Sequence, residues 1–435
     1  MIRTNIAVLG GGLSGLAAAC ALEEAHADYI LFERRPELGG FTRTAKVGDF
    51  CFDYTGHFLH LARYSSPARV PYANLRDEDW MLIPRKACCY VANSMVTAPL
   101  QYHLGELPQD VLEKCAKSYD ERLSEVRDTP RNFKEYLVHS FGRSVAELFL
   151  IPQNEKTLAT SVDRLSVRAV RRFFPVADDA VIRRGMKKEP VQASSYNSFF
   201  WYPRTGGISA LTEGFAKRVQ GTRLNHEGCT VNLAKRELNL KDGTKVAWGA
   251  LLTSVPLPQF CLMTEDPALV SATSELTHSA TISVNIGVSG DVAPALAGLH
   301  WVYVPNPAIP FYRVGVYSNI SQGVCASGHA ALYAEVGVRP EKLSNLDLVE
   351  VENQVICALE DLGWVNRSRI SCVVTHVLNC AYVHHTPGAE AVLPLINKRL
   401  SEANVFLIGR YGRWDYTSME DSIDDGISTA KKLIL

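Results

Sequence analysis

Three glycines near the start of the chain have the spacing of a phosphate-binding turn. Gly10, Gly12 and Gly15 follow residues 6–9, an apolar stretch that predicts a strand. Gly10 would form the tight turn, Gly12 would let the backbone approach a pyrophosphate, and Gly15 would let the next helix pack on the sheet. The N-terminus of that helix would offer free N–H groups to a phosphate. The spacing therefore predicts a dinucleotide-binding unit.

A carboxylate and two more glycines extend this unit. Glu33 closes a second apolar stretch, where its side chain can bind a ribose hydroxyl, and Gly39 and Gly40 follow after Arg34. An NAD enzyme does not need glycines at this place. The sequence here resembles flavoproteins of the glutathione-reductase and amine-oxidase kind, in which the chain passes close to an extended FAD. The resemblance implies FAD as the cofactor.

The C-terminal segment narrows the resemblance. Residues 409–423 read GRYGRWDYTSMEDSI and precede a predicted helix. This pattern resembles that of UDP-galactopyranose mutase and its bacterial relatives, within the superfamily of FAD-dependent amine oxidases and protoporphyrinogen oxidases. The last helix of such proteins points its N-terminus at the flavin, where it stabilises negative charge. Four further segments of the chain resemble the same family, namely 50–61, 98–102, 202–208 and 310–319.

The resemblance implies a redox-neutral interconversion of the pyranose and furanose forms of a nucleotide sugar. In such a reaction, N5 of reduced FAD attacks the anomeric carbon while cationic and hydroxyl side chains hold the diphosphate. Arg313 is the first choice for that role, with Tyr416 and Tyr382 as hydroxyl donors. Arg204 is a weaker choice because an arginine in a glycine turn can simply cap the loop. His57 would orient the N5 region through the geometry of its loop.

The same resemblance implies a set of FAD contacts along the whole chain. They are Gly10, Gly12, Leu13, Ser14, Gly15, Glu33, Arg34, Gly39, Gly40, Phe41, Thr42, Gly56, His57, Val231, Gly409, Arg410, Tyr416, Met419 and Ser422.

Other readings of these residues stay open. Arg313 could form a structural ion pair, and Tyr382 could be an ordinary buried aromatic residue. A second diphosphate-binding arginine has no fixed counterpart, with Arg171, Arg172, Arg183 and Arg184 as options. The main rival function is an amine oxidase or desaturase, in which FAD takes hydride from a C–N or C–C bond. A third is a flavin-binding protein without turnover.

Composition excludes several classes of partner. The formal net charge is −1, so we expect no general attraction to nucleic acid or to anionic membranes. No apolar run is long enough for a membrane span, and the 11 scattered cysteines are typical of a cytoplasmic protein with reduced thiols. His57 and His60 have no neighbouring carboxylate or cysteine, so no metal site is predicted. The expected partners are a nucleotide sugar and an external or NAD(P)H-derived reductant of the flavin; the oligomeric state stays open.

Alternation of strands and helices at both ends, around an extended middle, predicts an α/β fold. We expect an FAD-binding, Rossmann-like domain of the glutathione-reductase type, with a helical insert and an antiparallel-sheet substrate domain. The FAD domain would comprise residues 1–75, 190–265 and 401–435. The insert would span 101–185, and the substrate domain 266–400.

Overall fold

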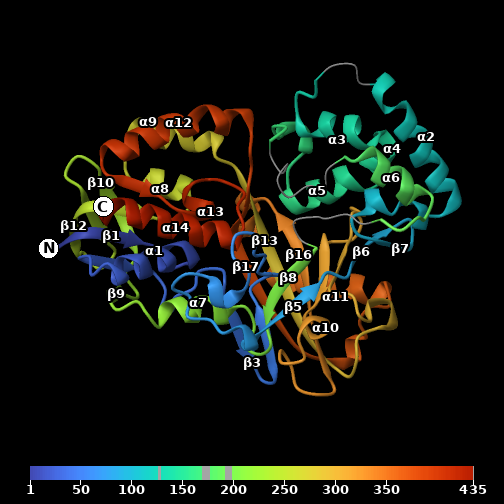
Figure 1. Ribbon diagram of the computed structural model, residues 1–435, viewed down its shortest axis with the longest axis horizontal. Helices are drawn as coiled ribbons and strands as arrows, with labels where there is room; N and C mark the ends of the chain where they lie inside the picture. The colour runs from blue at the N-terminus through green and yellow to red at the C-terminus, as the bar shows by residue number, and fades with distance from the viewer. Residues whose placement is uncertain (126–128, 169–176, 192–197, 435) are drawn as a thin grey trace.

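The computed structural model describes residues 1–125, 129–168, 177–191 and 198–434. In this part of the chain two seven-stranded sheets form the framework. Both chain termini lie beside one of these sheets. The other sheet lies at the centre of the molecule, with a group of helices beyond it (Figure 1). No helix among the described residues is long and apolar enough to cross a membrane.

The first sheet is built around the predicted strand, turn and helix. Strand β1 (Ile2–Leu9) is followed by helix α1 (Leu13–Glu24) and by β2 (Tyr29–Phe32), which pairs with β1 in parallel. All side chains of α1 from Leu13 to Leu22 are buried, because the helix lies between the sheet and the last helix of the chain. This explains why its sequence is apolar on every face.

Segments distant in sequence complete this sheet. The strand order is β10-β11-β12-β1-β2-β9, and β18 pairs in parallel with β12. Parallel pairing of β1 with both β2 and β12 aligns their carboxyl ends, where ligands bind in open α/β sheets. The remaining strands are β9 (Thr222–Arg223), β10 (Gly228–Asn232), β11 (Glu237–Leu240), β12 (Lys245–Thr253) and β18 (Val405–Leu407).

The second sheet has the order β17-β13-β16-β15-β14-β6-β7 and is antiparallel except where β14 meets β6. Its long central strand β13 is buried on both faces. The strands are β6 (Ala87–Val91), β7 (Ser94–Thr97), β13 (His278–Ser289), β14 (Trp301–Tyr303), β15 (Arg313–Val316), β16 (His329–Val338) and β17 (Ile370–Val383).

A helical group lies beyond the second sheet (Figure 1). Helix α5 connects the group to the sheet, because Lys156 Nζ donates to the carbonyl oxygens of Val304, Asn306 and Phe311 at 2.6–2.8 Å. The helices are α2 (Gln109–Glu125), α3 (Phe133–Phe141), α4 (Arg143–Val145), α5 (Ile151–Leu158) and α6 (Asp179–Met186).

The expected α/β class with a Rossmann-like unit is confirmed. The division of the chain into five segments stays a proposal. The pairing of β6 with β14 associates residues 87–97, which that division leaves unassigned, with the antiparallel sheet.

Candidate functional site

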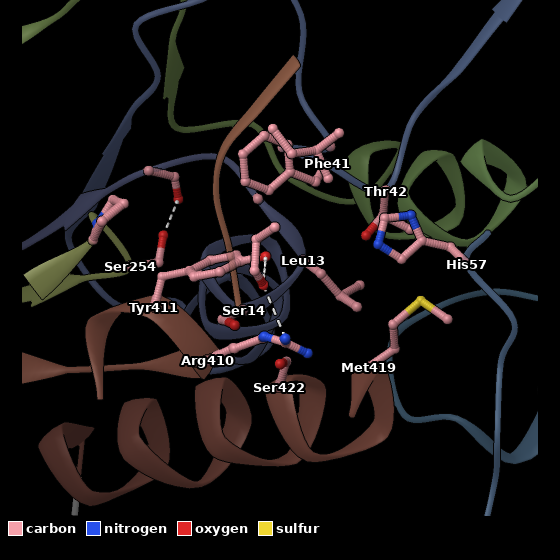
Figure 2. A pocket seen from close by; sticks show the side chains of 18 of the residues that line it. Leu13, Ser14, Phe41, Thr42, His57, Ser254, Arg410, Tyr411, Met419 and Ser422 are labelled. Carbon is pink, nitrogen blue, oxygen red and sulfur yellow. Dashed lines mark hydrogen bonds between the residues drawn. The ribbon is translucent and has the colours of Figure 1, made fainter. Parts of the chain in front are cut away.

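A cavity of about 500 Å³ lies between the glycine turn of the first sheet and one face of the second. It is lined by residues from the start, the middle and the end of the chain. Figure 2 shows Leu13 and Ser14 of α1, Phe41 and Thr42, and Met419 and Ser422 of the last helix around it.

The glycine turn forms the floor of this cavity. Glu33 is buried, and its two carboxylate oxygens accept from the backbone N–H groups of Gly11 (2.7 Å) and Arg35 (2.9 Å). Gly39 and Gly40 have positive φ angles of +112° and +60°, which favour glycine. A Cβ on Gly40 would lie 3.0 Å from the Cα of Gly12. The two glycine segments therefore pack backbone against backbone beside the cavity.

The N-terminal end of the last helix also lies at the cavity. Helix α14 (Met419–Ile434) packs along α1, and Met419 and Ser422 of its first turn line the cavity. Before it, Gly409 starts the short helix α13 (Gly409–Gly412) with φ of +70°, and a Cβ there would lie 2.0 Å from Ser14 Oγ. The N-terminal end of a helix carries partial positive charge, which can stabilise negative charge in the cavity, although Glu420 and Asp421 lie in the same turn.

Arg313 and Glu335 form a buried, two-pronged ion pair on the wall opposite the glycine turn. Arg313 Nε and Nη2 donate to the two oxygens of Glu335 at 2.6 and 2.8 Å, and the Glu335 side chain is 0% exposed. Burial alone would raise the pKa of Glu335, but the charge of Arg313 and three hydrogen-bond donors lower it overall. The pair is therefore ionised at neutral pH, and Nη1 of Arg313 is the guanidinium nitrogen that it does not use.

The register of the sheet explains the place of this pair. His376, Ser283, Glu335, Arg313 and Tyr303 occupy paired positions on β17, β13, β16, β15 and β14. Side chains at paired positions lie on the same face of a sheet. The row therefore runs across the wall, and Arg313 and Tyr303 at its end line the cavity.

A cluster of tyrosines surrounds a second arginine. Tyr382 and Tyr416 stack with ring centroids 5.7 Å apart, and the Arg410 guanidinium lies 4.3 Å from the centre of the Tyr416 ring. Arg410 also donates to the carbonyl oxygen of Ala381 at 2.9 Å. Burial raises the pKa of both tyrosines, so each hydroxyl keeps its proton and can donate a hydrogen bond at neutral pH.

Some buried polar atoms of the lining have no partner within the protein. Among the described residues these include Nδ1 of His57, Nε of Arg410 and the hydroxyl oxygen of Thr417. Unpartnered buried polar atoms are costly, and ligands or water usually satisfy them. Together with the glycine cradle and the start of α14, they fit a large ligand that carries phosphate and polar ring atoms.

Comparisons with known proteins agree with this geometry. Residues 8–74 match the model of an NAD(P)-binding Rossmann-like domain. A crystal structure of reduced UDP-galactopyranose mutase superposes with a TM-score of 0.92 at 22% identity, over 99% of this chain and 94% of that chain. The chain has the fold of UDP-galactopyranose mutase. The predicted resemblance to mutase-like flavoproteins of the amine-oxidase superfamily is thus confirmed at the level of the fold.

Two further relatives act on other substrates. A double mutant of putrescine oxidase has a TM-score of 0.66 at 13% identity, over 100% of this chain and 99% of that chain. A stretch of 49 residues is 45% identical to a carotenoid 3,4-desaturase of Haloarcula japonica, and it covers 11% of this chain and 10% of the relative. The first likeness is one of fold, and the second is confined to a short stretch of the chain.

Most of the predicted site residues line the cavity. Of the predicted catalytic residues, Arg313, Tyr416, Tyr382 and His57 do so. Of the predicted cofactor contacts, those that line it are Gly10, Gly12, Leu13, Ser14, Glu33, Arg34, Gly39, Gly40, Phe41, Thr42, Gly56, His57, Gly409, Arg410, Tyr416, Met419 and Ser422.

Three predicted residues lie elsewhere. Arg204 is exposed outside the lining, and its Nε donates to the carbonyl oxygen of Glu78 at 2.8 Å, so it fixes a loop. Val231 is a core residue of β10, and the cavity is instead lined by residues 226–228 at the start of this strand. Gly15 faces the turn, where a Cβ would lie 1.9 Å from the oxygen of Gly10.

The second diphosphate-binding arginine is not found among the described options. Arg183 pairs with Asp120 and Asp179 on the surface of the helical group, and Arg184 donates to the carbonyl oxygen of Pro190. Neither lines the cavity. Arg171 and Arg172 lie outside the described residues.

Several lining residues are not indicated by any pattern in the sequence. Trp301, Tyr303, Thr281 and Tyr312 come from the second sheet and the residue before β15. The alternation of β13 and β14 signals strands, but it does not say which face meets the cavity. Only the pairing of distant strands decides that.

Replacement of Arg204 tests whether this residue belongs to the site. Because Arg204 contacts a loop carbonyl and lies outside the lining, we expect Arg204→Ala to change flavin content and turnover less than about twofold. Absorbance of the purified variant and its activity measure both quantities. A loss of turnover comparable with that of an Arg313 variant would return Arg204 to the site.

Burial of the Asp53 carboxyl group should make the free energy of unfolding depend on pH. It is buried and accepts from Thr44, Tyr202 and the N–H of Ile208, and burial raises its pKa to about 6. The folded protein then holds this proton more tightly than the unfolded chain. The stability that Asp53 contributes is therefore full below its ordinary pKa near 4 and is lost as the pH rises through about 6.

We expect urea unfolding at pH 5 and pH 7 to show part of this loss in the wild type, up to about 1.3 kcal/mol, and not in Asp53→Asn. Asp49→Asn, at an exposed position of the same hairpin, is the control. Equal pH dependence in wild type and Asp53→Asn would contradict the assignment.

Proposed function

We propose that the protein binds FAD in this cavity and interconverts the pyranose and furanose forms of a nucleotide sugar. The observation that carries the proposal is Arg313, which lines the same cavity as the glycine cradle and keeps one guanidinium nitrogen outside its pair with Glu335. Such a nitrogen, beside tyrosine hydroxyls, suits a diphosphate group. The likeness to UDP-galactopyranose mutase over 99% of the chain supports the same reading.

The residues present fit the cofactor. The turn from Gly10 to Ser14 and the start of α1 would hold the pyrophosphate, and Glu33 would bind the adenosine ribose. Gly39 to Thr42 would follow the ribityl chain, and the first turn of α14 would face the flavin ring. Reduced flavin supplies nucleophilic chemistry at its N5 atom when it is bound there.

Side chains of the protein would bind and stabilise the leaving diphosphate. Arg313, held by Glu335, would present Nη1 to a phosphate oxygen, and Tyr382 and Tyr416 would donate their hydroxyl protons. Preorganised donors stabilise charge that develops on the leaving group without reorganising during the reaction. Desolvation lowers the pKa of His57 to about 4, so the imidazole is neutral at neutral pH. It would orient the flavin ring rather than exchange a proton.

An oxidase or desaturase is the second candidate. The carotenoid 3,4-desaturase match and the putrescine oxidase fold favour it, as do the aromatic residues Trp301, Tyr303 and Tyr312 of the lining. The two candidates differ in the charge of the substrate. For the mutase we further propose an external or NAD(P)H-derived reductant and action in the cytoplasm.

Binding distinguishes the two candidates. We would titrate the oxidised and reduced protein with UDP, GDP and dTDP, and follow the flavin absorbance. A saturable spectral change with one nucleoside diphosphate, lost in a variant without the Arg313 charge, is the expected result. No change with any diphosphate, together with bleaching of oxidised flavin by an amine or a polyene, would favour the oxidase or desaturase.

A further inference from the structure

The loop that carries His57 contacts the second sheet at its start and the last helix at its end. It begins after the hairpin β3 (Thr44–Val47) and β4 (Phe50–Asp53), and it runs to Tyr64. His57, Phe58 and His60 of this loop line the cavity. The imidazole of His57 has an unpartnered Nδ1 and is therefore not fixed through that atom by the protein.

A buried carboxylate of the second sheet holds the start of the loop. Glu335 Oε1 accepts from the hydroxyl group of Thr55 and from the N–H of Gly56, the latter at 3.1 Å. The same carboxylate pairs with Arg313. The position of residues 55 and 56 is thereby linked to the diphosphate-facing arginine.

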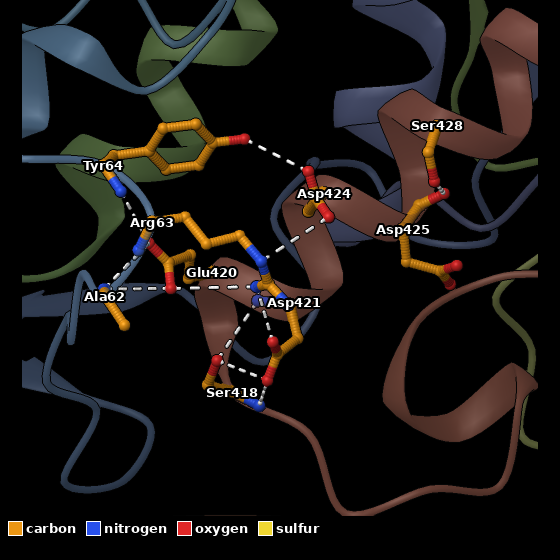
Figure 3. A network of polar contacts seen from close by, with 9 residues as sticks. All are labelled: Ala62, Arg63, Tyr64, Ser418, Glu420, Asp421, Asp424, Asp425 and Ser428. Carbon is orange, nitrogen blue, oxygen red and sulfur yellow. Dashed lines mark hydrogen bonds and ion pairs between the residues drawn. The ribbon is translucent and has the colours of Figure 1, made fainter. Parts of the chain in front are cut away.

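A second buried carboxylate holds the end of the loop. Glu420 is 1% exposed and accepts from three consecutive N–H groups, those of Ala62 (2.9 Å), Arg63 (2.7 Å) and Tyr64 (3.1 Å). Figure 3 shows the carboxylate of Glu420 beside this stretch of backbone. Three donors to an ionised carboxylate are strong bonds, and they offset the cost of burying its charge.

The surrounding ion pairs are weaker anchors. Arg63 is half exposed and lies 2.7 Å from Asp421 and 3.8 Å from Asp424, while the Tyr64 hydroxyl donates to Asp424 at 3.3 Å. Asp421 is buried, but Arg63 is half exposed, so solvent screens both of these pairs and weakens them. The backbone bonds to Glu420 are therefore the main restraint at this end of the loop.

Glu420 also belongs to the part of the helix that meets the cavity. It lies between Met419 and Ser422 in the first turn of α14, and both of these line the cavity. We propose that Glu420 is a positioning residue, which fixes the loop 57–64 to the start of α14 and thereby holds the His57 imidazole against the flavin. This inference rests on the flavin site proposed above.

The matched variants are Glu420→Gln and Asp424→Asn. Glutamine keeps the size of the side chain but replaces one acceptor oxygen by an NH₂ group that faces N–H donors. Asp424→Asn changes the same network without touching the backbone of residues 62–64. Each would be made in the wild type and in His57→Ala, as the flavin-loaded protein.

Hydrogen exchange and the flavin potential report the two halves of the inference. We expect Glu420→Gln to speed amide exchange at residues 62–64 by about tenfold or more, as for the loss of a hydrogen bond to a charged group, with Asp424→Asn near wild type. We also expect it to shift the flavin midpoint potential, and to add no shift when His57 is already alanine. If the shift came only from the loss of a negative charge near the flavin, it would be equal in the wild-type and His57→Ala proteins.

The contrary outcomes are separable. Unchanged exchange in Glu420→Gln, or a potential shift that persists fully in the His57→Ala background, would overturn the positioning role alone. If His57→Ala itself leaves the flavin spectrum and potential unchanged, the proposed place of His57 beside the flavin fails, and this inference fails with it.

Discussion

Arg313→Ala is expected to destabilise the protein by about 3–5 kcal/mol and to abolish binding of the nucleotide sugar. The large effect arises because Glu335 is 0% exposed and would keep its charge without the two hydrogen bonds from Arg313. Urea unfolding measures the first effect, and titration with the nucleoside diphosphate that binds the wild type measures the second.

A double variant separates the two roles of the arginine. Arg313→Gln with Glu335→Gln replaces the ion pair by neutral groups that can still hydrogen-bond, so we expect most of the stability to return and the flavin to stay bound. Substrate affinity should stay low, because the guanidinium group that we assign to the diphosphate is missing. Wild-type affinity in this double variant would show that Arg313 is only a structural ion pair.

Gly15→Ala is the second variant with a large expected effect. A Cβ at this position would lie 1.9 Å from the carbonyl oxygen of Gly10, which is backbone and cannot turn aside. Helix α1 would have to move away from the turn, at a cost of roughly 1–3 kcal/mol, and flavin affinity should fall up to about 100-fold. Thermal unfolding and the flavin retained on dialysis measure these changes.

Gly12→Ala is the matched comparison. Its φ of −76° suits any residue, and a Cβ there would meet only the Cα of Gly40 at 3.8 Å. We therefore expect the protein to fold as stably as the wild type but to bind flavin poorly, because the added methyl group faces the pyrophosphate. Full flavin content in Gly12→Ala would place the pyrophosphate elsewhere.

Local patterns predicted the two ends of the chain well. The glycine turn and the segment that begins at Gly409 are short, contiguous motifs whose backbone requirements restrict the residue types. Most of the residues predicted there line the cavity, with Gly15 as an exception. Val231 does not line the cavity, whereas residues 226–228 do, because sequence alone does not show which end of a strand meets a cavity.

Contacts between distant segments could not be predicted. Glu335 and Glu420 look like ordinary surface carboxylates in the sequence, and only the folded chain brings them to residues 55–64. The pairing of β6 with β14 joins segments more than 200 residues apart. Arg204 resembled a site residue through its neighbouring glycines, yet its side chain turns to a loop carbonyl.

The product formed by the reduced protein distinguishes a mutase from an oxidase or desaturase. We would incubate the flavin-loaded protein anaerobically with UDP-, GDP- and dTDP-sugars, in the oxidised form and after reduction with dithionite, and separate the products by chromatography. We expect a new isomer of unchanged mass from one sugar nucleotide, formed only by the reduced protein. No isomer from any sugar nucleotide, with an amine or an unsaturated compound bleaching the oxidised flavin instead, would contradict it.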